Sequence, residues 1–120
     1  MILTGESVDA GSNDSNRLND LLETLGKQLN EPVMKSTARL IIIISLAINR
    51  KLSFTDLLTI TSLGKGSLSN HLEKLQNNGL IKIKTVFRQN GPRISIEITE
   101  NGMEAYRNYS ALLRELTSLK

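Results

Sequence analysis

The spacing of apolar residues changes at Gly79, and this change limits the folds open to the chain. Before the glycine, leucines recur at the spacing of one face of a helix. After it, isoleucines alternate with polar residues, as in a strand with one buried side. A glycine followed by an apolar residue such as Leu80 is typical of the left-handed ending of a helix. The sequence therefore predicts a helix over 65–78 followed directly by a strand.

The alternation after Gly79 runs to Ile98 and is interrupted once. The interruption, at 89–92, contains Asn90-Gly91, the strongest short signal for a hairpin. We therefore expect a two-stranded antiparallel hairpin over 81–98, with one apolar and one basic face. Because an isolated hairpin is marginally stable in water, its isoleucines are expected to pack on helices.

A shorter helix is predicted just before helix 65–78. Ser53 and Asp56 have the spacing of a capping box, which opens such a helix. Residues 62–64 then turn the chain into helix 65–78. Two short helices joined by a tight turn that contains glycine form the helix-turn-helix arrangement.

Residues 32–48 are apolar on nearly every side, which is the pattern of a central helix surrounded by other elements. Pro32 suits the first turn of this helix. The four consecutive isoleucines at 41–44 favour a buried strand as the competing interpretation. A run of about 17 residues without a turn signal is too long for a typical strand, so we expect a helix. Residues 52–54, after a polar turn, are expected to form a very short strand.

Two amphipathic helices are expected at the ends of the chain. Residues 1–16 are rich in Gly, Ser, Asn and Asp and are interpreted as a mobile tail, whereas 17–30 form an accessory helix. Thr99 caps a last helix over 99–120. Each helix has an apolar stripe that must be covered by the core or by a second subunit. The residues predicted for a dimer interface are Leu18, Leu21, Leu22, Leu25, Tyr109, Leu112, Leu116 and Leu119.

The length and composition of the chain restrict its class. A chain of 120 residues is expected to form one domain, here 17–120, with a core over 32–99 and a mainly α fold with a small β-hairpin. The absence of cysteine excludes disulfides and thiolate metal sites and favours a reducing compartment, so we expect a cytoplasmic location. The apolar run at 40–48 is far shorter than the roughly 18 residues that a membrane span needs. No secretory signal is expected at the N-terminus.

The chemistry of an enzyme is not visible in the sequence. The chain has a single histidine, His71, so we expect no metal site and no cofactor. It also has no nucleophile paired with a base, no phosphate-binding glycine loop and no carboxylates clustered near the histidine.

Positive charge is concentrated in one part of the chain. The whole sequence has a net charge of +3. Between Lys65 and Arg93 lie six basic residues and a single acidic one, Glu73, whereas residues 1–31 are acidic overall. Such a concentration argues for an anionic partner more strongly than the isoelectric point does.

Residues 32–116 resemble the winged helix transcriptional regulators of the MarR and ArsR type. The most diagnostic part is Leu-Ser-Asn-His-Leu-Glu-Lys-Leu at 68–75, followed by Gly-Leu-Ile at 79–81. The resemblance implies sequence-specific binding of duplex DNA by a homodimer, with helix 65–78 in the major groove and hairpin 81–98, the wing, along an adjacent groove or the backbone. Further segments that carry the resemblance are 39–42, 52–57 and 98–102.

The resemblance also assigns a set of side chains to DNA. Asn70 is the first candidate for a base contact, since its amide can pair with adenine through two hydrogen bonds. The lysines and arginines are assigned mainly to phosphates, with Arg88 or Arg93 as an alternative minor-groove contact. Two residues keep a second interpretation: Ser69 as a small residue where helices approach, and His71 as a half-buried ring. The predicted DNA-binding residues are Lys65, Ser67, Ser69, Asn70, His71, Lys74, Lys84, Arg88, Gln89, Asn90 and Arg93.

A function from another class is consistent with the same sequence. In this alternative, the winged helix is a protein-protein interaction module whose basic face docks an acidic partner. For a regulator of the MarR type, the resemblance also allows a small-molecule effector between the dimer helices and the DNA-binding part, although no group of polar residues indicates a particular ligand.

Overall fold

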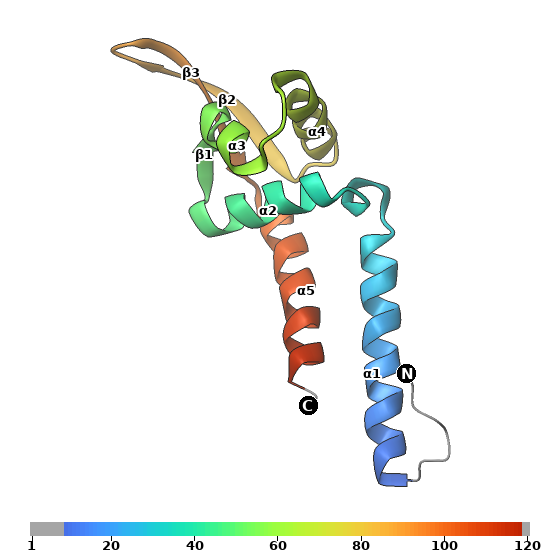
Figure 1. The fold of residues 1–120 in the computed structure, drawn as a ribbon. Coiled ribbons are helices and arrows are strands. Elements are labelled where there is room, and N and C mark those ends of the chain that lie inside the picture. The colour runs from blue at the N-terminus through green and yellow to red at the C-terminus, as the bar shows by residue number, and fades with distance from the viewer. Residues whose placement is uncertain (1–8, 119–120) are drawn as a thin grey trace.

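The computed structural model describes residues 9–118, while residues 1–8 and 119–120 lie outside the described part. A long N-terminal helix is followed by a central helix, a short strand, two helices, a hairpin and a closing helix (Figure 1). Within residues 9–118, none of the helices combines the length and apolar character that a membrane crossing requires. The elements are α1 Asp9–Leu29, η1 Pro32–Met34, α2 Thr37–Asn49, β1 Lys51–Ser53, α3 Phe54–Thr61, α4 Lys65–Asn77, β2 Ile81–Arg88, β3 Gly91–Ile98 and α5 Glu100–Thr117.

The sheet has three antiparallel strands in the order β1-β3-β2. β2 and β3 form the predicted hairpin, with Ile81 opposite Ile98 at its base and Arg88 opposite Gly91 at its tip. β1 is the predicted short strand and pairs with the base of β3. It lies one residue earlier than expected and ends at Ser53, because that side chain already caps α3.

The central helix is α2, and its apolar side chains join those of α3, α4 and the sheet in one core. The preference for a helix over a buried strand at 41–44 is therefore confirmed. A helix pairs its own backbone groups and presents side chains to several neighbours at once, which suits this position. The largest fully buried side chains of the described part are Ile42, Ile43, Leu46, Leu57, Leu68, Leu75, Ile81 and Ile96.

The prediction of one continuous helix over 32–48 is wrong at its beginning. Residues Pro32–Met34 form a short 3-10 helix, and α2 starts only at Thr37. The break is stabilised by Ser36, whose hydroxyl accepts a hydrogen bond from the backbone N–H of Arg39 at 3.3 Å, as an N-cap does. The guanidinium of Arg39 also binds carbonyl groups of η1, which holds the break in place.

The N-terminal helix is longer than predicted. α1 begins at Asp9 rather than at Arg17, so residues 9–16, which we expected to be part of a tail, are helical. The remaining residues of that expected tail, 1–8, lie outside the described part. Once a helix has formed, each further residue gains a backbone hydrogen bond, and 9–16 contains no proline to prevent this extension.

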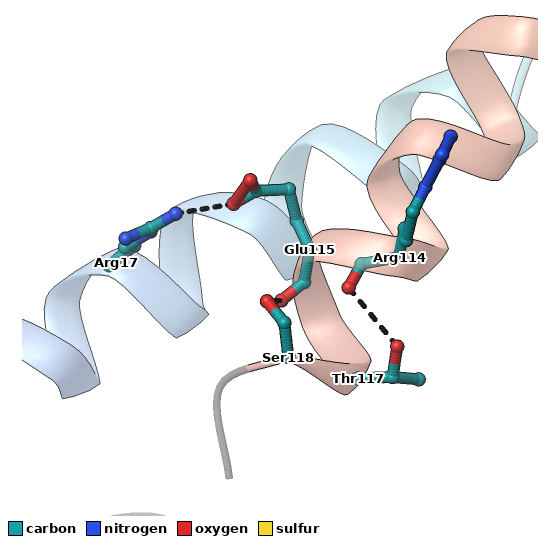
Figure 2. A network of polar contacts seen from close by, with 5 residues as sticks. All are labelled: Arg17, Arg114, Glu115, Thr117 and Ser118. Atoms are coloured by element: carbon teal, nitrogen blue, oxygen red, sulfur yellow. Dashed lines mark hydrogen bonds and ion pairs between the residues drawn. The ribbon is translucent and has the colours of Figure 1, made fainter.

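α1 and α5 pack against each other in opposite directions, and both project from the core (Figure 1). The Arg17 guanidinium, from the middle of α1, pairs with the Glu115 carboxylate near the end of α5 (Figure 2). Closer to the core, Gln28 Nε2 donates to the carbonyl of Ala105 at 3.4 Å. The radius of gyration is 18.4 Å, well above the roughly 14 Å of a compact chain of this length. The terminal helices therefore extend beyond the core, and Leu22 and Leu113 on them remain exposed.

Candidate nucleic-acid interface

α3 and α4 are joined by a tight turn whose shape depends on side chains. Ser53 and Asp56 form the predicted capping box at the start of α3, with hydrogen bonds of 2.9 and 3.1 Å. At its end, Ser62 adopts the left-handed conformation with φ 58°. The Thr61 hydroxyl accepts a hydrogen bond from the backbone N–H of Leu63 at 3.3 Å. The predicted helix-turn-helix is therefore present.

α4 has one buried and one exposed side, as the spacing of its leucines predicts. Leu68, Leu72 and Leu75 lie in the core. At 100° per residue, Asn70 lies nearly opposite them, in the middle of the exposed side. Ser69 lies beside a hollow of about 150 Å³ that is lined by α4, by the hairpin and by Phe54 of α3. The predicted DNA-binding residues that α4 exposes are Lys65, Ser67, Ser69, Asn70 and Lys74.

The end of α4 is fastened to the beginning of α5. Gly79 has the predicted left-handed conformation, with φ 74°, and the Leu80 N–H donates to the carbonyl of Leu75 at 3.0 Å. The Thr99 hydroxyl donates to the carbonyl of Gly79 at 2.7 Å. Gly102 packs so closely that a Cβ atom there would collide with the Leu80 carbonyl oxygen. The first turn of α5 therefore sets the position of the end of α4.

The hairpin has the predicted basic side. Its register places Lys82, Lys84, Arg88 and Arg93 on one face, and all four are exposed. Lys84 Nζ lies 3.2 Å from a carboxylate oxygen of Glu97, so this charge has a counterion on the neighbouring strand. The other three cations form no salt bridge within residues 9–118.

The apolar side of the hairpin is covered only at its base. Ile81 and Ile96 are buried in the core, whereas Ile94 is 46% exposed and Phe87 is 79% exposed. The reason is the shape of the molecule, since the hairpin extends past the helices (Figure 1). The expectation that its isoleucines pack on helices is therefore correct only at the base.

Phe87 is a further candidate for a DNA contact, and it is not among the DNA-binding residues predicted from the sequence. Its place in the alternating pattern assigned it to the apolar side, yet no helix reaches the tip to cover it. The one feature of the sequence that could have indicated its exposure is its position beside Arg88, next to the turn of the hairpin. The tip residues Phe87, Arg88, Gln89, Asn90 and Arg93 together line a surface hollow of about 440 Å³.

His71 is half-buried at the flank of α4 and contacts a buried arginine. Nη1 of Arg39 lies 3.1 Å from Nδ1 of His71. The same guanidinium donates from Nε to the Val33 carbonyl at 2.7 Å and from Nη2 to the Pro32 carbonyl at 3.1 Å. Arg39 is 7% exposed and is the one buried charged side chain in the described part of the chain. Burial, Arg39 and Lys74, in that order, lower the pKa of His71, so the ring is uncharged at neutral pH.

The residues predicted for a dimer interface lie on α1 and α5, which pack against each other within one chain. Leu22 stays 49% exposed and the neighbouring stripe residue Leu113 stays 38% exposed. Leu119 lies outside the described residues. The partly buried members of the set are Leu18, Leu21, Leu25, Tyr109, Leu112 and Leu116.

A cavity of about 690 Å³ opens between α1, η1 and α5. Val33, Met34 and Leu112 give it apolar walls, while Lys27 and Asn108 add polar groups. The residues of such a cavity cannot be predicted from the sequence, because the cavity depends on how α1 packs against α5.

Solved structures with a similar fold include a transcriptional regulator homologue, a transcriptional regulator assigned to the MarR family, and NadR. The transcriptional regulator homologue from Pyrococcus horikoshii OT3 is 30% identical over 80% of this chain and 95% of its own, with a TM-score of 0.70. A protein from Enterococcus faecalis V583 assigned to the MarR family is 16% identical over 81% of this chain and 86% of its own, with a TM-score of 0.66. NadR in complex with 4-hydroxyphenylacetate is 21% identical over 98% of this chain and 82% of its own, with a TM-score of 0.63. The last two likenesses show the fold alone.

A family model supplies the assignment. No match was found among curated proteins. Residues 38–117 match the family described as winged helix DNA-binding domain, and this match includes α4 and the whole hairpin. The helix-turn-helix, the wing and the closing helix are the elements expected from the resemblance in the sequence. The chain belongs to the winged helix DNA-binding domain family.

Proposed function

We propose that this protein is a transcriptional regulator that binds a specific duplex DNA sequence as a homodimer. The observation that carries the proposal is the exposed polar side of α4 next to a protruding basic hairpin, in a chain of a DNA-binding family. In the proposed complex α4 lies in the major groove, and the wing follows an adjacent groove or the backbone.

α4 supplies the sequence-reading contacts in this proposal. Asn70 is exposed opposite the buried leucines, and its amide can donate to and accept from adenine in the major groove. Ser67 and His71 are second candidates for base edges. Lys65 and Lys74 serve phosphates, which hold the helix in place without reading the sequence.

The wing supplies affinity. Lys84, Arg88 and Arg93 contact phosphates in the proposed complex, with Lys84 giving up part of its pairing with Glu97. Either arginine of the tip can enter a narrow minor groove, where the negative potential is enhanced. Gln89 and Asn90 belong to the same tip and complete the wing contacts.

The terminal helices form the dimer interface in this proposal. α1 and α5 project from the core and keep apolar residues partly exposed, which a second copy can cover. Two-fold symmetry then presents two α4 helices to one face of the duplex. Their centres are expected to lie about 34 Å apart, matching two half-sites of a palindrome.

A small-molecule effector is a further part of the proposal. The cavity between α1, η1 and α5 has mainly apolar walls with a few polar groups, as ligand sites in proteins have. NadR, which shares the fold, was solved with 4-hydroxyphenylacetate bound. With DNA as the partner, we also propose a cytoplasmic location.

The alternative is an interaction module that docks an acidic protein through the same basic surface. Binding to fluorescent duplex DNA separates the two functions. We compare a random-sequence pool with the region upstream of the protein's own gene, each at several salt concentrations. A regulator prefers the upstream region, and the logarithm of its affinity falls linearly with the logarithm of salt concentration.

A matched pair of variants sharpens this experiment. Arg93→Ala should weaken binding to every duplex and reduce the salt slope by about 1. Arg107→Ala, on α5 and paired with Glu100, should change neither quantity. The proposal fails if the wild-type protein binds neither DNA at low salt.

A further inference from the structure

We infer that Arg39 is a positioning residue for DNA recognition, which holds His71 in the tautomer that presents an Nε2–H donor at the flank of α4. The functional half of this inference rests on the proposed DNA binding. The structural half concerns the free protein and stands on the contacts of one guanidinium.

The chemistry of the two side chains determines the tautomer. Arg39 Nη1 and His71 Nδ1 are 3.1 Å apart, within hydrogen-bond distance. A guanidinium has only donors and remains protonated in proteins. Nδ1 must therefore be the acceptor, and the single proton of the neutral ring lies on Nε2.

The guanidinium is held so that it cannot turn away. Its Nε and Nη2 donate to the carbonyls of Val33 and Pro32 at 2.7 and 3.1 Å. The side chain is 7% exposed, so releasing any of these groups would leave a buried polar atom without a partner. These two hydrogen bonds fix the guanidinium in the orientation in which its third nitrogen, Nη1, faces His71.

The charge of the surroundings favours the same state. The charged groups that act on the ring are Arg39 from α2 and Lys74 from α4 itself, and both lower the pKa of His71, after burial. A protonated ring would place two cations in contact at Nδ1. The neutral Nε2–H form is consequently the one that meets a partner at neutral pH.

Nε2 is left free to bind outside the protein. No hydrogen bond from Nε2 is made within residues 9–118, and no buried side-chain nitrogen or oxygen there lacks a partner. Nε2 therefore reaches the surface. One turn away on either side of His71 stand Ser67 and Lys74, both exposed, so the donor belongs to the polar side of α4. Its partner on DNA is an acceptor, either an atom of a base edge, such as guanine O6 or N7, or a phosphate oxygen.

Nuclear magnetic resonance of the free protein tests the structural half directly. His71 is the only histidine, so one imidazole appears in the long-range ¹H–¹⁵N correlation spectrum. At pH 7.5, chosen to exceed the ordinary histidine pKa of about 6.5, we expect an unprotonated Nδ1 and a protonated Nε2. A ring protonated at Nδ1, or an even mixture of the two forms, would overturn the inference.

Substitution of Arg39 tests whether this side chain determines the tautomer of His71. Arg39→Met should increase the share of the Nδ1–H form and lower the preference for a selected duplex over random DNA by about 10-fold. Arg107→Met, at an exposed arginine of α5, is the matched control and should change neither quantity. An Arg39→Met protein that folds and keeps the wild-type tautomer overturns the inference.

Two substitutions of His71 test whether its Nε2–H group contacts DNA, and they do so even if the Arg39→Met protein does not fold. The amide of asparagine reaches the position of Nδ1 and can accept from Arg39, whereas the amide of glutamine reaches the position of Nε2 and can donate outward. We expect His71→Gln to keep most of the affinity for the selected duplex and His71→Asn to lose about 10-fold. The opposite order would mean that His71 only completes the contacts of Arg39, and it would overturn the inference.

Comparison of the two DNAs identifies the acceptor. A loss in His71→Asn that is confined to the selected duplex assigns Nε2–H to a base edge, and an equal loss on random DNA assigns it to a phosphate. If the wild-type protein binds no DNA, the proposed function fails. The tautomer measurement then still tests whether the hydrogen bond from Arg39 fixes the proton of His71 on Nε2.

Discussion

Asn70 is the residue on which sequence discrimination depends in this account. It lies in the middle of the exposed side of α4, opposite three buried leucines. Its amide carries a donor and an acceptor in fixed geometry, whereas the lysines beside it carry only charge. The two kinds of contact should therefore respond differently to substitution.

Replacing Asn70 with Ala should lower the discrimination between the operator and random DNA by about 1 to 3 kcal/mol. Affinity for random DNA should change little, because phosphate contacts remain. Competition binding with the two duplexes measures the difference, with Asn49→Ala at the exposed end of α2 as the control. An equal loss on both DNAs would reassign Asn70 to the backbone.

The protonation of His71 links stability to pH. Burial, Arg39 and Lys74 lower its pKa in the folded protein, so the unfolded chain takes up the proton first as the pH falls. The free energy of unfolding should therefore be independent of this group above about pH 7 and should decrease below the ordinary pKa of about 6.5.

Urea unfolding of wild type and His71→Asn between pH 5 and 8, a range set by the ordinary histidine pKa of about 6.5, isolates this contribution. Carboxylates titrate in both proteins, so the difference between the two curves belongs to His71. We expect the wild type to lose more stability toward pH 5 than the variant. Parallel curves would show that the ring is not held neutral.

Among the elements, the junction of α4 with α5 is the most constrained. Gly102 has no room for a methyl group beside Leu80 and Ile98, whereas Gly26 in α1 has open space around the same position. The two glycines differ only in what surrounds them, which makes them a matched pair.

Gly102→Ala should destabilise the protein by about 2 to 3 kcal/mol, because the collision is with backbone that cannot turn aside. Gly26→Ala should instead stabilise α1 by up to about 1 kcal/mol, since alanine is the better helix former. Thermal and urea unfolding measure both. A tolerated Gly102→Ala would mean that α5 does not hold the end of α4 as described.

The elements that the sequence predicts well depend on residues close together in the chain. The capping box of Ser53 and Asp56 spans three residues, and the Gly79 helix end spans five, so both are visible as local patterns. The break between η1 and α2 at Ser36 does not follow from such a local pattern. It is supported by the Arg39 guanidinium, whose third contact is 32 residues away at His71.

The candidate site likewise has features that follow from local sequence patterns and features that depend on tertiary packing. The exposed side of α4 follows from the period of its leucines, and the basic side of the wing follows from alternation. The exposure of Phe87 does not, because it depends on how far the hairpin extends past the helices. The hold of Arg39 on His71 is equally invisible, since a lone arginine in an apolar helix has no local signature.

The whole molecule is elongated, with the DNA-binding elements and the paired terminal helices on different sides of α2 (Figure 1). An exposed Leu22 on α1 is costly in water unless another molecule covers it. A second copy with two-fold symmetry is the commonest way to cover such a surface.

Leu22→Glu should therefore separate the proposed dimer without unfolding the protomer, because the side chain is already half exposed in one chain. Ile48→Glu, at an apolar residue of α2 that is 70% exposed, is the control and should leave the dimer intact. Light scattering gives the mass, and circular dichroism gives the helix content. A Leu22→Glu protein with the mass of the wild-type dimer would remove this part of α1 from the interface.

Selection of duplexes from a random pool by the wild-type protein, followed by sequencing of the bound DNA, shows whether the protein recognises a particular DNA sequence. We predict an enriched inverted repeat whose half-site centres lie about 10 base pairs, or one helical turn, apart. The enriched duplex should bind more tightly than a shuffled version at physiological salt. A pool that remains random after repeated selection, with shuffled and selected DNA bound equally, would mean that this protein does not read DNA sequence.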